Sequence, residues 1–171
     1  KLLSIADFAP YKVVRTIRFQ ENVRVQVLNK DSSKIYVNQN NFLGFIIADT
    51  HTGKILKTVE VKSVDWRSVW NRTPRPHVPH GCPSHGIALT PDGKEIWLAD
   101  GLFKKIHIFS NTDDPQEIAT IDTPDGVYWM TFGLDGKLVY ASSGDIIDAK
   151  TRKIVGSTKS DVVAAAEAHL P

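Results

Sequence analysis

Cysteine, excess charge and long apolar runs are all scarce in this sequence of 171 residues. Cys82 is the only cysteine, so no disulfide can form within the chain. Lysine and arginine total 21 against 19 aspartates and glutamates, a balance that argues against nucleic acid or an anionic membrane as a partner. No apolar run approaches the roughly 18–20 residues that a membrane-spanning helix needs, so no transmembrane segment is expected.

Signatures of common catalytic and cofactor sites are also missing. The sequence has no calcium-binding loop, phosphate-binding loop or dinucleotide-binding glycine pattern. Ser84 and His85 are adjacent and Asp92 follows, but nothing in the sequence shows that the three converge as a hydrolase triad. The motifs therefore predict no particular reaction and no bound cofactor.

An internal repeat is the strongest feature that is present. Three segments share a short apolar strand, a tight polar turn and a second apolar strand, and they lie at 25–37, 86–98 and 129–140. Asp-Gly in the second and third copies supplies the positive φ that hairpin turns favour. Ser32 and Ser33 stand in place of that glycine in the first copy, which predicts a longer or looser turn there.

The segments that follow each hairpin extend the repeat to four strands. Their apolar residues recur with the two-residue period of a strand, which predicts four-stranded antiparallel sheets. The later repeat spacing, from Asp92 to Asp135, is close to the roughly 40–45 residues of a propeller blade. The expected class is all-β, a single domain over 1–171 built of β-propeller blades at 23–61, 84–123 and 127–160.

The remaining segments are expected to flank or separate these blades. Residues 12–20 alternate like the outer strand of a preceding blade. Residues 62–83 contain Trp66, Trp70 and four prolines, and we interpret them as an inserted loop ordered partly by aromatic packing. Residues 161–171 have a helical composition and are expected to form a short terminal helix or a frayed tail.

Residues 85–100, which read HGIALTPDGKEIWLAD, resemble the repeat of YVTN-family β-propellers. The resemblance is close in the middle copy and looser in the flanking copies, and it extends over about 23–160. It implies stacked four-stranded blades around a central channel, in a bacterial protein group whose members are often exported or attached to the cell surface. An extracytoplasmic location is therefore expected, with the cytoplasm as the alternative. The resemblance implies no reaction, because propellers host enzymes and scaffolds alike.

The chain is short for a closed propeller. A seven-bladed ring needs roughly 300 residues, whereas this sequence provides about three to three and a half blades. An open arc leaves exposed sheet faces and edges, which favour association. Three arrangements would close the ring: a longer protein of which this is a piece, which we favour; a second copy of the chain; or a separate chain that supplies the other blades.

One cluster of side chains suggests metal binding. Imidazole and thiolate ligands suit zinc or copper, and the cluster comprises His77, His80, Cys82 and His85. The alternative is structural: His85 belongs to the repeat pattern and would hydrogen-bond a neighbouring blade, while Cys82 would be a small buried apolar residue. We favour the structural alternative.

A second set of residues suggests a ligand platform. Trp66, Trp70 and Trp129, together with His85, would present aromatic surface to a glycan or a protein at the channel mouth, or the tryptophans would instead pack within and between blades. The sequence therefore favours a non-catalytic binding or surface scaffold. The alternative is an enzyme or cofactor-binding propeller with a site near His85, of lyase or oxidoreductase type, by analogy of fold alone.

Overall fold

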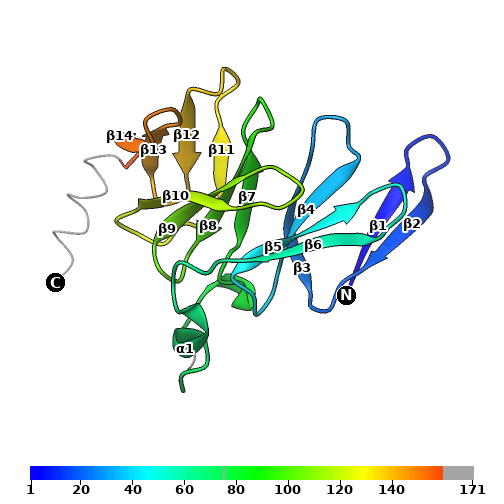
Figure 1. Ribbon diagram of the computed structural model, residues 1–171, viewed down its shortest axis with the longest axis horizontal. Helices are drawn as coiled ribbons and strands as arrows, with labels where there is room; N and C mark the ends of the chain where they lie inside the picture. The colour runs from blue at the N-terminus through cyan, green and yellow to red at the C-terminus, as the bar shows by residue number, and fades with distance from the viewer. Residues whose placement is uncertain (75, 160–171) are drawn as a thin grey trace.

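The computed structural model describes residues 1–74 and 76–159 and is almost entirely β-structure (Figure 1). It contains three antiparallel sheets of four strands each and one two-stranded sheet. The all-β prediction and the four-stranded sheets are therefore confirmed, and each four-stranded sheet is called a blade below. The predicted tail at 161–171 lies outside the described residues.

Strand order follows the chain within every blade. Blade 1 consists of β3 (Val23–Leu28), β4 (Lys34–Gln39), β5 (Gly44–Asp49) and β6 (Ile55–Glu60). Blade 2 consists of β7 (Gly86–Leu89), β8 (Glu95–Asp100), β9 (Lys105–Ser110) and β10 (Glu117–Asp122). Blade 3 consists of β11 (Met130–Phe132), β12 (Leu138–Ala141), β13 (Asp145–Asp148) and β14 (Lys153–Ser157). All three lie within the ranges predicted for them.

A two-stranded hairpin precedes blade 1. It pairs β2 (Lys12–Arg18), which corresponds to the predicted outer strand, with β1 (Leu2–Asp7), which the sequence pattern did not reveal. Its buried Ile17 joins Ile35 and Val37 of blade 1 in one apolar cluster. The hairpin thus packs on blade 1 as the blades pack on one another.

The first hairpin turn differs from its expectation. The connections at 29–33, 90–94 and 133–137 have the same length in the three blades. Ser32 adopts a left-handed conformation with φ of 58°, much like Gly93 at 72° in the second copy. Asn29 compensates, because its side-chain oxygen accepts a hydrogen bond from the Lys34 N–H at 2.9 Å. Serine at this position costs backbone strain but does not lengthen the turn.

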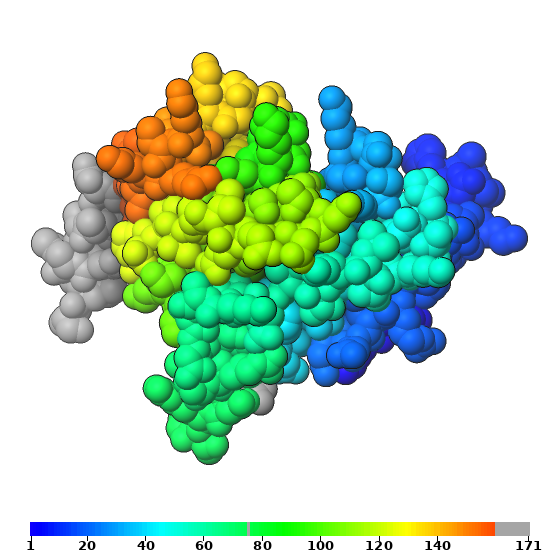
Figure 2. Space-filling model, viewed as in Figure 1, coloured from blue at the N-terminus to red at the C-terminus, as the bar shows by residue number. Residues whose placement is uncertain are grey.

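Apolar side chains point alternately to the two faces of each central strand, and they fill the space between neighbouring blades. In β8, Ile96 and Leu98 face blade 1, whereas Trp97 and Ala99 face blade 3. Figure 2 shows the resulting stack in chain order, from the blue hairpin to the orange third blade. Blades 1 and 2 are therefore covered on both faces by their neighbours in the described part of the chain, and blade 3 is covered by blade 2 on one face.

The predicted inserted loop carries a short helix, α1 (Trp66–Trp70), and a 3-10 turn, η1 (Pro79–Gly81). Figure 1 shows α1 projecting below the sheets. Asp65 caps α1 by accepting a hydrogen bond from the Ser68 N–H at 3.3 Å. Neither helical segment in the described part of the chain has the length and hydrophobicity of a membrane-spanning helix.

Candidate functional site

The first strands of the three blades lie side by side. β7 contacts both β3 and β11, so the three strands form one inner surface. The last residue of each of these strands pairs with an equivalent residue, the second one, of the next strand in its blade. These last residues are Leu28, Leu89 and Phe132. The two residues that precede each of them are therefore also equivalent in the repeat, whereas the pairing of β3 shifts between Val23 and Gln26.

Several polar and aromatic residues lie together at one end of the inner surface. Arg24 and His85 each stand four residues before the last residue of their strand, Leu28 and Leu89, although the pairing of β3 shifts between Val23 and Gln26 and that of β7 does not. Tyr128 takes that position in blade 3, but its ring packs so closely on Gly101 that an added methyl group there would lie 1.9 Å from it. The neighbouring Trp129 is the aromatic residue left at the surface.

Trp129 is exposed although its backbone is held firmly. Its indole side chain retains 53% of its accessible surface. Its N–H donates to Ser142 Oγ at 3.1 Å, and its carbonyl accepts from the Ser142 N–H at 2.9 Å. Trp129 also lines a hollow of about 320 Å³ together with Val25 and Gln26 of β3. A large aromatic side chain thus stands beside a concave surface on a backbone that is fixed by hydrogen bonds.

Gly86 explains how closely blades 2 and 3 meet at this end. A Cβ atom at Gly86 would lie 2.9 Å from the Tyr128 carbonyl oxygen and 3.0 Å from Trp129 Cα. Both of those neighbours are backbone atoms and cannot rotate away, so a larger residue would push the blades apart. The glycine therefore fixes the position of Trp129 relative to His85.

His85 and His80 form a stacked pair. Their ring centroids are 5.2 Å apart with 29° between the planes. Burial lowers the pKa of His85, and electrostatic interactions with His80 and Arg24 lower it further, against an opposing hydrogen bond to the Tyr128 backbone. The His85 imidazole is therefore mainly uncharged at neutral pH.

Arg24 is the fixed positive charge of this region. Its Nε donates to Asn40 Oδ1 at 2.6 Å. Within residues 1–74 and 76–159 it has no carboxylate within ion-pair distance. Arg24, His80, His85 and Trp129 are called the mouth cluster below.

Comparisons with known proteins identify the fold. No protein-family model matches the chain, and no curated protein matches it in sequence. Among solved structures, hydrazine synthase of Kuenenia stuttgartiensis, a propeller-containing protein, matches 90% of this chain with a TM-score of 0.70 and 19% sequence identity. The chain has a β-propeller fold. It spans 41% of the length of that neighbour, and at this identity the likeness establishes the fold alone.

The propeller arrangement makes the inner surface the wall of the channel and the mouth cluster one end of it. His85 was predicted at this position, and Trp129 was predicted as part of a ligand platform. Arg24 was not predicted, because the first copy departs from the repeat pattern before β3. Its proximity to His85 becomes visible only in the structure, where the charge of Arg24 acts on the His85 imidazole.

The predicted tryptophan platform needs correction. Trp66 and Trp70 each retain only 3% exposure and belong to the apolar cluster between blades 1 and 2. Their positions on successive turns of α1 direct both rings toward the sheets. Only Trp129 of the predicted three is available to a ligand.

The predicted metal cluster needs correction as well. Cys82 is fully buried, and its Sγ donates to the backbone oxygens of Gln39 at 3.2 Å and Ser84 at 3.1 Å. Burial raises the pKa of the Cys82 thiol to about 12, so the thiolate that a metal requires is disfavoured. No three histidine, cysteine, aspartate or glutamate side chains within the described ranges gather in a metal-binding arrangement. His80 and His85 meet, but His77 is exposed elsewhere on the loop.

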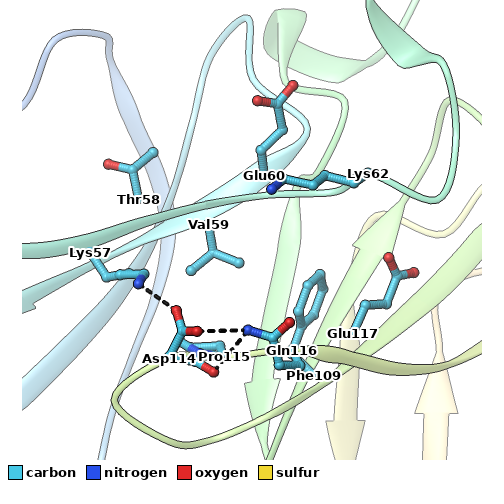
Figure 3. Close-up of a pocket in the computed structure, with 10 residues that line it drawn as sticks. All are labelled: Lys57, Thr58, Val59, Glu60, Lys62, Phe109, Asp114, Pro115, Gln116 and Glu117. Atoms are coloured by element: carbon cyan, nitrogen blue, oxygen red, sulfur yellow. Dashed lines mark hydrogen bonds and ion pairs between the residues drawn. The ribbon is translucent and has the colours of Figure 1, made fainter.

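A second hollow, of about 400 Å³, lies between the outer strands β6 and β10 of the propeller (Figure 3). One ion pair joins the two blades across it, as Lys57 Nζ lies 2.5 Å from Asp114 Oδ1. Gln116 Nε2 donates to Asp114 Oδ2 at 2.9 Å and fixes the same carboxylate. This hollow is best explained as a polar seam that joins two blades.

Proposed function

We propose that the chain is a non-catalytic β-propeller module of the YVTN type that binds a ligand at the mouth cluster. The exposed, backbone-anchored Trp129 is the observation that carries this proposal. A rigid aromatic surface beside a hollow offers stacking area to a sugar ring or a protein side chain. His85 precedes Gly86, which packs against Trp129, and it forms no ion pair with a carboxylate among the described residues. It therefore has no carboxylate orienting it as a general base.

The proposal includes an extracytoplasmic location and a glycan or protein ligand. The location is supported by the resemblance of residues 85–100 to a family whose members are often exported. The ligand class is supported by the indole surface of Trp129, which suits the apolar face of a pyranose.

Replacing Trp129 with alanine is expected to weaken ligand binding by about tenfold or more, because loss of a stacking partner of this size removes over ~1.4 kcal/mol. Isothermal titration with methyl glycosides of neutral and acidic sugars measures this effect. Phe8→Ala is the control, since Phe8 is an exposed aromatic residue in the β1–β2 turn, away from the mouth cluster. Unchanged affinity in the Trp129 variant, or turnover of a bound glycoside by the native chain, would contradict the proposal.

We also propose that further propeller blades complete the ring, beginning at the hairpin β1–β2. In blade 1 the third strand, β5, is paired on both sides, whereas β1 is paired only with β2 in the described residues. Beside β1 lies a hollow of about 790 Å³, lined largely by apolar side chains that include Leu3, Ile5 and Leu28. Its place and lining match the inner two strands of a blade whose outer two strands are β1 and β2.

A lysine at Leu28 is expected to weaken the docking of an inner strand pair by about tenfold, since it places a charge against apolar side chains. A synthetic peptide with the sequence of residues 84–100, one of this chain's own inner strand pairs, is the probe. Ile118→Lys is a matched control, because Ile118 and Leu28 are 46% and 47% exposed and Ile118 lies on the outer strand β10. Absence of saturable peptide binding would overturn this proposal. A mass of twice one chain in light scattering would also overturn it and would indicate that a second copy of the chain completes the ring.

A further inference from the structure

The mouth cluster offers hydrogen-bond donors around an aromatic surface. An arginine guanidinium and an indole N–H donate and never accept. Arg24 uses Nε for Asn40, which leaves its two terminal nitrogens available, and the exposed Trp129 presents its indole edge. A ligand that fits these groups must supply acceptors close to a ring that can stack.

Arg24 carries the permanent charge of this region. It lies close enough to lower the pKa of His85, and no carboxylate of the described residues forms an ion pair with it. The acidic residues nearest in sequence are engaged elsewhere, because Glu21 lies 2.8 Å from Lys1 and Asp125 lies 2.5 Å from Lys159. Arg24 therefore faces the mouth without the carboxylate that would neutralise it, and an oxyanion from a ligand would fill that role.

The histidine pair supports the same conclusion by its geometry. His80 has φ of 56°, a left-handed conformation that histidine adopts at a cost, and this places its ring against His85. His85 is in turn tied to the Tyr128 backbone, next to Trp129. We interpret His85 as a positioning residue that holds the exposed His80 imidazole at the edge of the mouth, where its N–H is a further donor.

We propose that the mouth cluster binds a sugar ring that carries an oxyanion, with the ring on the Trp129 indole and the oxyanion on the Arg24 guanidinium. This inference rests on the proposed binding function and specifies its ligand. Carboxylate and phosphate both match the guanidinium fork. Hexuronic acids and sugar phosphates are therefore the two sources of this chemistry.

The experiment compares three ligands that share one ring: methyl glucoside, methyl glucuronide and glucose 6-phosphate. Isothermal titration of the native chain is expected to show that at least one charged sugar binds about tenfold more tightly than the neutral one. The two charged ligands identify the source of the oxyanion. Raising the salt concentration is expected to reduce the preference, since the mouth is open to solvent.

Arg24→Gln is expected to bring the ratio of charged to neutral affinity down to about one, and Arg24→Lys to restore part of it, because lysine keeps the charge without the fork. Arg72→Gln is the matched control, as Arg72 is an exposed arginine after α1. Equal native affinity for all three sugars would overturn the oxyanion inference and leave the binding proposal standing. Binding of none of them would count against the binding proposal itself. An unchanged ratio in Arg24→Gln, with its unfolding midpoint intact, would also overturn the inference.

Discussion

Replacing Trp97 with alanine is expected to lower the free energy of unfolding by about 3–5 kcal/mol. Trp97 has 0% exposure and lies in the cluster between blades 2 and 3. Its ring meets Phe132 edge-on with centroids 5.3 Å apart, and its Nε1 donates to Glu95 Oε2 at 2.9 Å. Truncation leaves a cavity that the flanking sheets cannot close, because each is fixed by its own strand pairing.

Trp129→Ala is the matched control, because it removes the same side chain from an exposed site. Its unfolding free energy is expected to stay within about 0.5 kcal/mol of the native value. Urea titration followed by circular dichroism measures both variants. Similar losses in the two would contradict the assignment of Trp97 to the fold and of Trp129 to the binding surface.

Replacing His107 with leucine is expected to destabilise the chain by about 3–5 kcal/mol, since it leaves buried acidic groups without their partner. His107 is fully buried in β9, with Nε2 3.0 Å from Asp100 Oδ2 and Nδ1 2.7 Å from Glu117 Oε1. Ser63 of the inserted loop also donates to Glu117, at 2.8 Å. The histidine therefore links β8, β9 and β10 of blade 2, and through Glu117 it also links them to the inserted loop.

The same site makes stability depend on pH in a defined direction. Burial by itself lowers the pKa of His107, but the hydrogen bonds and charges of Asp100 and Glu117 outweigh it and raise the pKa above the usual 6.5. The stabilisation from the charged imidazole is therefore fully present below about pH 6.5 and is lost as the pH rises through the folded-state pKa.

Urea titrations of the native chain and His107→Leu across pH 6 to 9 test this dependence. The difference in unfolding free energy between the two is expected to shrink as the pH rises. His51→Leu is the control, because His51 is exposed in the β5–β6 turn and its loss should leave the native pH profile in place. A difference that grows with pH would contradict a charged His107.

The hairpin repeat was predictable because its information is local. Alternating apolar residues and Asp-Gly turns specify strands and tight connections without reference to the rest of the fold. Strand β1 escaped the pattern because only Leu3 and Ile5 are partly buried, and a stretch with so little inward surface gives a weak period. Ser32 shows that a local signal can also mislead in the opposite direction. It is an unfavourable residue for this turn, but the hydrogen bond of the nearby Asn29 makes it tolerable.

The candidate site was predictable only in part, because exposure and direction depend on the packing of separate blades. Trp66 and Trp129 are the same residue type, yet one is buried beneath α1 and the other faces the channel. Cys82 stands near three histidines in sequence, but its thiol points into the interior. The position of Arg24 near His85 could be seen only in the structure, because its neighbours in the sequence do not match the repeat pattern at 85–100.

The indole N–H region of a two-dimensional proton–nitrogen NMR spectrum tests the central claim most directly. The chain has four tryptophans, so each indole gives one signal that a single substitution assigns. On titration with methyl glucuronide or glucose 6-phosphate, the signal of Trp129 is expected to shift to saturation while those of Trp66, Trp70 and Trp97 stay in place. A Trp129 signal that does not move with any of the three sugars, or equal shifts of the buried indoles, would contradict a binding site at the channel mouth.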